Sequence, residues 1–394
     1  MLLLLWVVET KTDFFKPKPT SDSIIHLLQE GPRSFHCEGK IVERNIVALR
    51  RCATGRVELR VKDENFTFHR GDEISFRAFF LRPQRFKNPG SFDIEFFYRR
   101  KGVDSLAFVG KGASIRKISS ASSGWVFRWL EEKREKLRGA IFREEEKNES
   151  GFLLALLLGE RSLLSKDISD AFQRSGLTHV LAISGLNVSL VSFLFYFFFR
   201  LLVALPPLAR SVLLFRIFPL FCVPPLWLYV ALADFPVSAV RSAIMSSLFL
   251  GALCLWRRLD WISVLALAAV LILLHSPLEM FGPSFQLSFA AVAFLILFFP
   301  KWKEGIASIG PKPVQWLLSG FGVTLISLLG VAPLLLWHFH YLSFAGLLAN
   351  VAAIPFLTFL IQPLATLGWL LTIFFSSDFF SLWEINRWLA GQFL

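Results

Sequence analysis

Polar side chains interrupt an otherwise apolar stretch at residues 177–200. The first half of this stretch carries His179, Ser184 and Asn187, whereas its second half is almost entirely aliphatic and aromatic. A helix that only anchored the chain would be apolar throughout, because each polar group in hydrocarbon costs free energy. The stretch therefore predicts either a helix that lines a polar path or a helix whose capped start lies in the membrane interface.

Four further polar side chains lie within long apolar segments. Arg241 falls a few residues into one of them, where a charge faces a bundle interior, water or a carboxylate unless it extends to the membrane surface. Asn350 precedes Pro355 by five residues, a pattern typical of a broken helix that exposes backbone groups. Each group can equally form a helix–helix hydrogen bond. The predicted channel-lining set is His179, Ser184, Asn187, Arg241, Gln286, Ser288 and Asn350.

The segment before these apolar runs carries a dense positive charge. Between residues 30 and 117, about 19 Lys and Arg stand against about 11 Asp and Glu, a surplus that attracts polyanions. Phe79, Phe86 and Phe97 are candidates to stack on unpaired bases, although each can equally belong to the core. The predicted DNA contacts are the densest basic clusters, Arg50, Arg51, Arg82, Arg85, Lys87, Arg99, Arg100 and Lys101.

The sequence shows no constellation of catalytic or metal-binding residues. His338 and His340 form the only close histidine pair, and they lack carboxylates or cysteines at metal-ligand spacing. No glycine-rich phosphate-binding loop is present either. We therefore expect no enzymatic activity, no metal and no cofactor.

Alternating segments between residues 34 and 119 predict a small all-β domain that holds the basic clusters. Apolar residues occupy every second position in residues 56–62 and 72–80, and turns separate such segments. About five strands without a helical pattern favour an OB-fold, with an SH3-like barrel as the nearest alternative. Cys37 and Cys52 fall in and just after strand-like segments that adjacent pairing could bring together. A disulfide there implies an oxidising, extracytoplasmic side, whereas two unrelated buried thiols are the alternative.

The rest of the chain predicts a polytopic α-helical membrane domain, since the chain is 54% hydrophobic with a mean hydropathy of +0.54. Residues 125–147 repeat apolar side chains at helical spacing opposite a charged face, which predicts a helix lying in the membrane interface. The last apolar run is long enough for two crossings, with Pro355 and Pro363 marking where it could break. We expect about 7–8 spans, near residues 177–203, 212–233, 237–256, 261–275, 285–300, 314–337 and 344–375.

Basic residues occupy alternate loops of this membrane domain. They follow the first, third and fifth spans: Arg200, Arg210, Arg216, Arg257, Arg258, Lys301, Lys303 and Lys312. The positive-inside rule makes these loops cytoplasmic and places the preceding barrel outside the cell (inner or plasma) membrane. The expected domains are the end of a truncated transmembrane helix and a linker (1–29), an extracytoplasmic OB-like domain (30–120), amphipathic interfacial helices (121–176) and the transmembrane domain (177–394).

Several sequence blocks resemble the ComEC competence family, the inner-membrane DNA-uptake channel of transformable bacteria. In the family's order they are NPGSFD at 88–93, LLGER at 157–161, SGLTH at 175–179, LAISGL at 181–186, VRSAIM at 240–245 and FQLSF at 285–289. The resemblance covers about residues 30–375. It implies translocation of single-stranded DNA into the cytoplasm during natural transformation. It also implies an outer DNA receptor and a cytoplasmic helicase-like motor as partners beside the lipid bilayer, and leaves the oligomeric state unknown.

Two departures from the family pattern limit what carries over. The family usually has His after the SGL triplet, where this chain has Asn187, so no role of that imidazole is transferred. No motif of the family's metallo-β-lactamase-like domain is present, and a chain ending at Leu394 is expected not to degrade the second strand. The alternatives are a small-solute transporter or exporter with the barrel as an assembly module, or a non-transporting membrane remnant of a larger DNA-uptake protein.

Overall fold

The computed structural model describes the chain in segments that make up two compact units, residues 1–131 and 132–394. The described residues are 24, 28, 33–43, 46–53, 55–61, 72–84, 94–100, 102–110, 115–119, 125–161, 163–181, 183, 185–204, 216–256, 258–374 and 380–394. Each unit is described by itself below.

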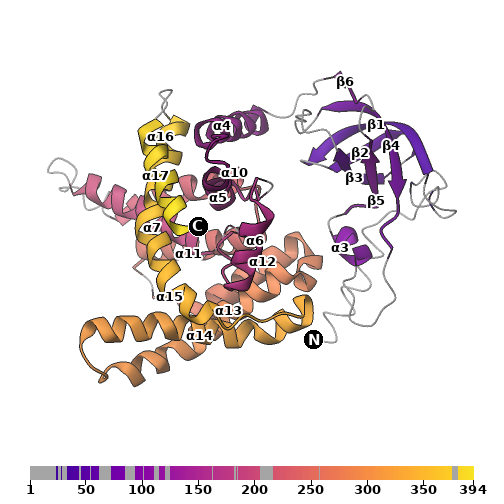
Figure 1. Cartoon of the computed structure of the whole chain (residues 1–394). Coiled ribbons are helices and arrows are strands. Elements are labelled where there is room, and N and C mark those ends of the chain that lie inside the picture. Colours follow the sequence, from indigo (N-terminus) through magenta and orange to yellow (C-terminus); the bar gives the residue numbers. More distant parts are fainter. Residues whose placement is uncertain are drawn as a thin grey trace. The chain divides into compact units, whose positions relative to one another are not determined.

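A closed β-barrel forms the first unit (Figure 1). Its strand order is β1-β2-β3-β5-β4, with β4 paired back to β1, and β6 also pairs with β4. The pair β3–β5 is parallel, whereas the other pairs are antiparallel. This arrangement confirms the predicted OB-like barrel. The strands are β1 (Arg33–Glu43), β2 (Ile46–Arg51), β3 (Gly55–Val61), β4 (Glu73–Leu81), β5 (Ser105–Val109) and β6 (Arg116–Ser119).

Buried and more exposed side chains alternate along the strands, and the buried ones form the barrel core. Ile74, Phe76 and Phe80 in β4 are fully buried, while the residues between them are half-buried or exposed. The sequence shows no helical pattern in this region, but the structure contains one helix, α3 (Ile94–Arg100), between β4 and β5. Tyr98 of this helix packs in a second small cluster against Ile46, Val103 and Leu106. A helix of two turns carries too few residues to show a helical period in the sequence.

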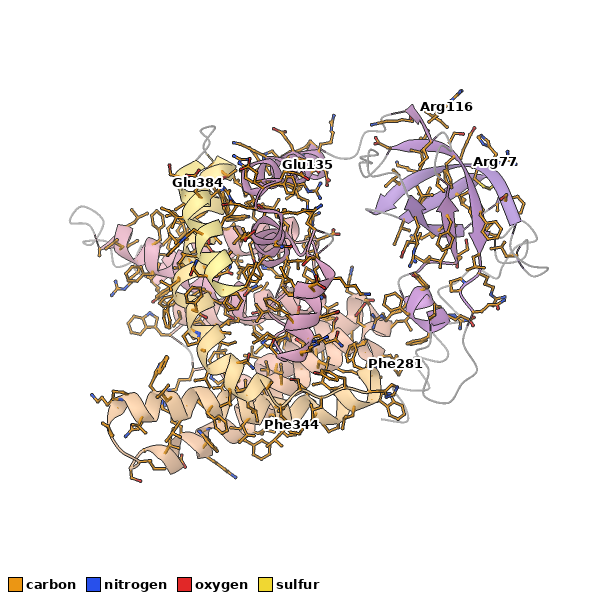
Figure 2. All side chains as sticks on the ribbon, in the orientation of Figure 1. Arg77, Arg116, Glu135, Phe281, Phe344 and Glu384 are labelled. Carbon is orange, nitrogen blue, oxygen red and sulfur yellow. A yellow bond between two sulfur atoms is a disulfide. The ribbon has the colours of Figure 1, made fainter. Side chains whose placement is uncertain are left out.

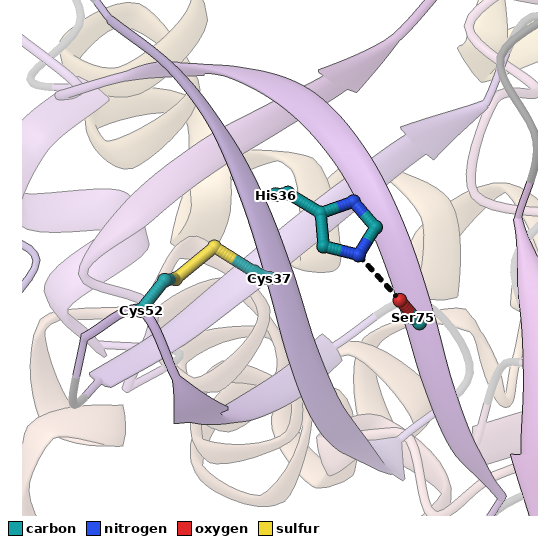
Figure 3. The surroundings of a disulfide bond; sticks show 4 residues. All are labelled: His36, Cys37, Cys52 and Ser75. Atoms are coloured by element: carbon teal, nitrogen blue, oxygen red, sulfur yellow. Dashed lines mark hydrogen bonds between the residues drawn. A yellow bond between two sulfur atoms is a disulfide. The ribbon is translucent and has the colours of Figure 1, made fainter.

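The predicted disulfide is present between Cys37 in β1 and Cys52 just after β2, with the two Cα atoms 5.3 Å apart (Figure 3). Cys37 is fully buried. The neighbouring residue, His36, points to the other side of β1, where its Nε2 lies 2.8 Å from Ser75 Oγ. The bond therefore ties the core side of β1 to the exposed residue that follows β2.

Reduction of this disulfide is expected to lower the free energy of unfolding of the barrel by about 3 kcal/mol, because it closes a loop of about 15 residues. Hydrogen exchange of the β1 and β2 amides in the full chain, with and without reductant, measures the change. The double variant Cys37→Ala/Cys52→Ala is the control and should show low protection in both conditions. Equal protection of oxidised and reduced wild type would contradict the prediction.

Helices make up the chain from Trp125 onward. They are α4 (Trp125–Ile141), α5 (Lys147–Leu158), α6 (Lys166–Arg174), α7 (Gly185–Val203), η1 (Phe218–Cys222), α10 (Val223–Leu232), α11 (Val237–Cys254), α12 (Trp261–His275), η2 (Pro277–Phe281), α13 (Pro283–Ile306), α14 (Lys312–Phe339), α15 (Gly346–Phe356), η3 (Leu357–Ile361), α16 (Gln362–Phe374) and α17 (Phe380–Phe393). In Figure 1, α13 and α14 run beside each other as a long hairpin.

Five helices of the described residues are long and apolar enough to cross a membrane. They are α7, α11, α13, α14 and the continuous helix Gly346–Phe374. Two shorter apolar helices, Phe218–Leu232 and Trp261–His275, coincide with two further expected spans. A helical membrane domain after a barrel is thus confirmed, and the number of seven or eight crossings stays a prediction.

The expected break at Pro355 and Pro363 is wrong. The chain from Gly346 to Phe374 continues as one helix, in which the π-helical turn η3 joins α15 to α16. A proline removes a backbone donor and crowds the preceding turn. The wider π turn accommodates this without ending the helix.

Residues 121–176 are only partly the amphipathic segment that the sequence predicts. In α4, Leu137 and Ile141 are buried while Trp125 is 75% exposed, so this helix does have two unlike faces. By contrast, α5 is buried on every side from Ser150 to Leu158. Its apolar residues fill the centre of the second unit, which is why they lack a polar face.

Buried ion pairs hold α4 to the end of α5. The carboxylate of Glu160, with a side chain 4% exposed, accepts from Arg138 Nη2 at 2.5 Å and lies 3.6 Å from Arg134 Nε. Arg134 also donates to the carbonyl of Leu158 at 3.5 Å. Two arginines of one helix thus share a single carboxylate of the next segment.

Candidate functional site: a polar end of the helix bundle and a basic barrel face

Arg241 joins three helices at one point of the second unit. It lies in the second turn of α11, is 6% exposed, and donates from Nη1 to the carbonyl of Ser288 in α13 at 2.9 Å. Its guanidinium lies 5.7 Å from the ring centre of Phe289. On the other side it reaches the start of α7, where a Cβ at Gly185 would lie 2.8 Å from Nη2. No carboxylate within the described ranges forms an ion pair with this guanidinium.

Serine side chains tie the starts of α7 and α11 together around this arginine. Ser242 Oγ donates to the carbonyl of Gly185 at 3.0 Å and lies 3.2 Å from Ser189 Oγ. Ser238 Oγ donates to the carbonyl of Ile183 at 2.8 Å. The sequence reasoning missed these hydroxyls, although Ser238 and Ser242 stand four residues apart and therefore share a helix face. Asn187, predicted for the lining, is buried in the first turn of α7.

A second contact joins α13 to the end of α14. Gln286 Oε1 lies 2.6 Å from His338 Nε2, and Gln286 Nε2 donates to the carbonyl of Met280 at 3.0 Å. His338 follows the expected span 314–337 directly and belongs to the last turn of α14. Among the described residues, no group of three or more His, Cys, Asp or Glu side chains is placed to hold a metal ion.

The loop before α7 packs closely on the start of α15. A Cβ at Gly176 would lie 3.0 Å from Gly346 Cα, and Ser343 Oγ donates to the carbonyl of Arg174 at 2.7 Å. His179 lies in this loop, exposed, with Nδ1 3.2 Å from the carbonyl of Gly176. Asn350 follows one turn after Gly346 in α15.

The predicted lining residues therefore gather at one end of the helices. The contacts above connect the starts of α7, α11, α13 and α15 with the end of α14. Within the predicted set, Arg241 and Ser288 are in direct contact, through the Ser288 carbonyl. Ser184 lies outside the described residues.

The predicted basic clusters of the barrel are only partly available for a ligand. Arg82 and Arg99 both bond to Glu95, at 3.4 and 3.1 Å, and Arg100 lies 5.9 Å from the ring centre of Phe97. The side chains of Arg50 and Arg51, and the residues Phe86, Arg85, Lys87 and Lys101, lie outside what the structure describes.

A different basic and aromatic row crosses the barrel surface. Arg60 in β3 pairs in register with Phe108 in β5, which in turn pairs with Phe79 in β4. The Arg60 guanidinium lies 5.7 Å from the Phe108 ring centre, and the rings of Phe79 and Phe108 are 46% and 36% exposed. Arg77, two residues before Phe79 on the same face of β4, projects from the outer surface (Figure 2). We call these four residues the barrel row.

Tyr98 fixes the position of the arginine in this row. Its hydroxyl accepts a hydrogen bond from Arg60 Nη2 at 2.5 Å. Burial, with a smaller contribution from the nearby Glu58 carboxylate, raises the pKa of Tyr98 above its usual value. The phenol therefore stays neutral at physiological pH, and the carboxylate that pairs with Arg60 is that of Glu58, whose Oε1 lies 3.3 Å from Arg60 Nε.

Comparison with known proteins shows which family the chain belongs to. Residues 156–394, more than half of its length, match the competence protein family. The chain belongs to the ComEC competence family. This confirms the resemblance that the sequence blocks indicate. No solved structure matches this competence-family chain.

Its curated relatives include competence and recombination proteins. ComE operon protein 3 of Bacillus subtilis is 34% identical over 241 residues, which are 60% of this chain and 29% of the relative. Recombination protein 2 of Haemophilus influenzae is 31% identical over 328 residues, 81% of this chain and 38% of the relative. Competence protein ComA of Neisseria gonorrhoeae is 31% identical over 275 residues, which are 68% of this chain and 37% of the relative. The chain thus spans about a third of the length of these relatives.

Proposed function

We propose that this chain passes single-stranded DNA through the cell membrane into the cytoplasm during natural transformation. Membership of the competence family gives the class of function. The observation that carries the proposal is Arg241, a buried guanidinium that joins three helix starts with no carboxylate partner among the described residues. A fixed positive charge without an internal counterion suits an anionic chain moving past it.

The barrel row collects the strand in this proposal. Arg60 and Arg77 contact phosphates, while Phe79 and Phe108 offer exposed rings to unpaired bases. Stacking on rings is tolerant of base identity, which suits uptake of DNA of any sequence. The strand then meets the polar end of the helices, where Arg241, Asn187 and the serine hydroxyls line its entry.

In the proposed orientation, the barrel and the polar helix end belong to the extracytoplasmic side of the membrane. The disulfide supports an oxidising compartment for the barrel, and the alternation of basic loops supports cytoplasmic ends for the first, third and fifth spans. An outer DNA receptor and a cytoplasmic motor are the partners that this direction of transport requires.

Removing the rings of the barrel row should weaken binding of a labelled oligothymidylate by roughly 5- to 150-fold per ring in the full chain, since each stacked base contributes about 1–3 kcal/mol. The variants are Phe79→Ala and Phe108→Ala. Replacing Arg60 or Arg77 with Gln should instead lower the slope of log affinity against log salt by about 1 each. Fluorescence anisotropy at several salt concentrations measures both effects.

Ile118→Ala is the matched control, because Ile118 is an exposed apolar residue on another strand, 53% exposed in β6. It should leave both affinity and salt slope unchanged. Binding by all variants equal to wild type would remove the barrel row as the DNA contact. No binding by the wild-type chain would favour transport of a small solute.

A further inference from the structure

Three side chains in α16 and α17 place uncharged polar groups deep inside the second unit. Gln362 and Thr366 in α16 are each 2% exposed, and Asn386 in α17 is 0% exposed. Neither the amide nitrogen nor the amide oxygen of Gln362 or Asn386, nor Thr366 Oγ1, meets hydrogen-bonding geometry with any described residue. Leaving a buried polar group unsatisfied costs about 1–3 kcal/mol, so several together call for an explanation.

The two residues of α16 share one face with an indole that has the same property. Gln362, Thr366 and Trp369 are spaced four and three residues apart, and Trp369 Nε1 is also buried without a bonding partner in the described chain. Tyr229 of α10 marks this face: its ring packs edge-on against Trp369 at 5.9 Å, and its hydroxyl lies near Gln362 and donates to the Leu156 carbonyl at 3.2 Å.

Asn386 lies in α17, which packs antiparallel on α16. Trp383 packs on Gly368, and its Nε1 donates to Thr372 Oγ1 at 3.2 Å. At the other end of the pair, Phe393 stacks on Phe356 at 5.9 Å. Along α17, Asn386 lies between Trp383 and Phe393, one turn after Trp383 on the buried face. Because the two helices are antiparallel, this position is level with the first turns of α16.

The backbone beside this cluster is also short of donors. Gln362 directly follows the π-helical turn η3 and precedes Pro363, which has no N–H. A carbonyl one turn earlier in the helix therefore lacks its usual bond. Turns of this kind occur where water or another group enters a helix ladder, often at functional sites.

The unpaired atoms include both hydrogen-bond donors and acceptors, and this mixture indicates which ligand the cluster can bind. The amide nitrogens of Gln362 and Asn386 and Trp369 Nε1 are donors, the two amide oxygens are acceptors, and the Thr366 hydroxyl is both. A metal cation would use only the acceptors and an anion only the donors, whereas water uses both and needs two to four polar partners. We propose that Gln362, Thr366 and Asn386 form an internal binding site for ordered water between α10, α16 and α17. This inference goes beyond the transport proposal and does not depend on what is transported.

Radiolytic hydroxyl labelling of the full chain in detergent tests the site, because radicals formed from bound water modify the aromatic side chains beside it. Trp369 should be labelled although it is fully buried. Trp383, equally buried in the same helix pair but with its Nε1 bonded to Thr372, is the internal control and should not be. Labelling of Trp369 as low as that of Trp383 would overturn the proposal.

The double variant Gln362→Leu/Asn386→Leu keeps the side-chain volume and removes the amides. Its labelling of Trp369 should fall to the level of Trp383, and undiminished labelling would show that these amides hold no water. If the variant does not accumulate, the wild-type comparison of the two tryptophans still decides. Labelling that is lost in sodium chloride but present in choline chloride would identify a cation as the occupant and overturn water.

Discussion

Replacing Arg241 with Met should lower DNA uptake by roughly 100-fold while the protein still accumulates in the membrane, since a charged contact in a buried site contributes about 3 kcal/mol. Methionine fills much of the arginine volume in the space between Gly185 and Phe289 but removes the charge. Transformation frequency, together with the amount of protein in isolated membranes, measures the effect. Because methionine keeps most of the side-chain volume, a fall in uptake would reflect the loss of the positive charge rather than a loss of packing.

Two further variants sharpen this expectation. Arg241→Lys keeps the charge but loses the planar group that reaches the Ser288 carbonyl and the Phe289 ring together, so uptake should be intermediate. Arg200→Met is the matched control: this arginine lies in the last turn of α7 and is exposed, and its loss should leave uptake close to wild type. Normal uptake in Arg241→Met would remove this guanidinium from the transport path.

Glu160→Gln should destabilise the second unit by about 3–5 kcal/mol, the cost typical of removing one partner of a buried ion pair. The substitution leaves Arg134, with a side chain 8% exposed, and Arg138 without the carboxylate that they share. Both arginines belong to α4, so this helix should separate from α5 before the rest of the unit unfolds. Denaturant unfolding in detergent, followed by the exposure of Ser150–Leu158 in hydrogen exchange, measures the change.

Glu135→Gln is the matched control for this substitution. Glu135 also pairs with Arg138, at 2.9 Å, but its side chain is 41% exposed. A solvent-exposed pair contributes less than about 1 kcal/mol, so this variant should stay close to wild type. Similar losses in both variants would mean that burial does not strengthen the Glu160 pair.

The strand pattern of the barrel was predictable because burial in a sheet repeats every two residues. Ile74, Phe76 and Phe80 follow that rule, and the disulfide followed from the expected neighbourhood of the first two strands. The barrel row was not predictable in the same way. It depends on the register of β3 against β5, two parallel strands separated by β4 and α3, and no local pattern encodes that register.

The polar end of the helices was predictable in its residue types and less so in its contacts. Arg241, Gln286 and Asn350 stand out because they interrupt apolar runs. Their partners are backbone carbonyls, small hydroxyls and a histidine, which the sequence does not distinguish from ordinary helix residues. Gln362 and Asn386 were not predictable for a related reason: a single amide in an apolar helix is common, and only its burial distinguishes it.

The position of β5 in the barrel has a consequence for how the domain forms. This strand lies between β3 and β4, both of which precede it in the chain. Until residues 105–109 are available, β3 and β4 present unpaired edges that can recruit strands from other molecules. The Cys37–Cys52 bond lies entirely within the earlier part of the barrel and can close without β5. The disulfide would therefore act first on folding kinetics. It holds β1 and the end of β2 together before β5 closes the barrel, while aggregation competes with folding.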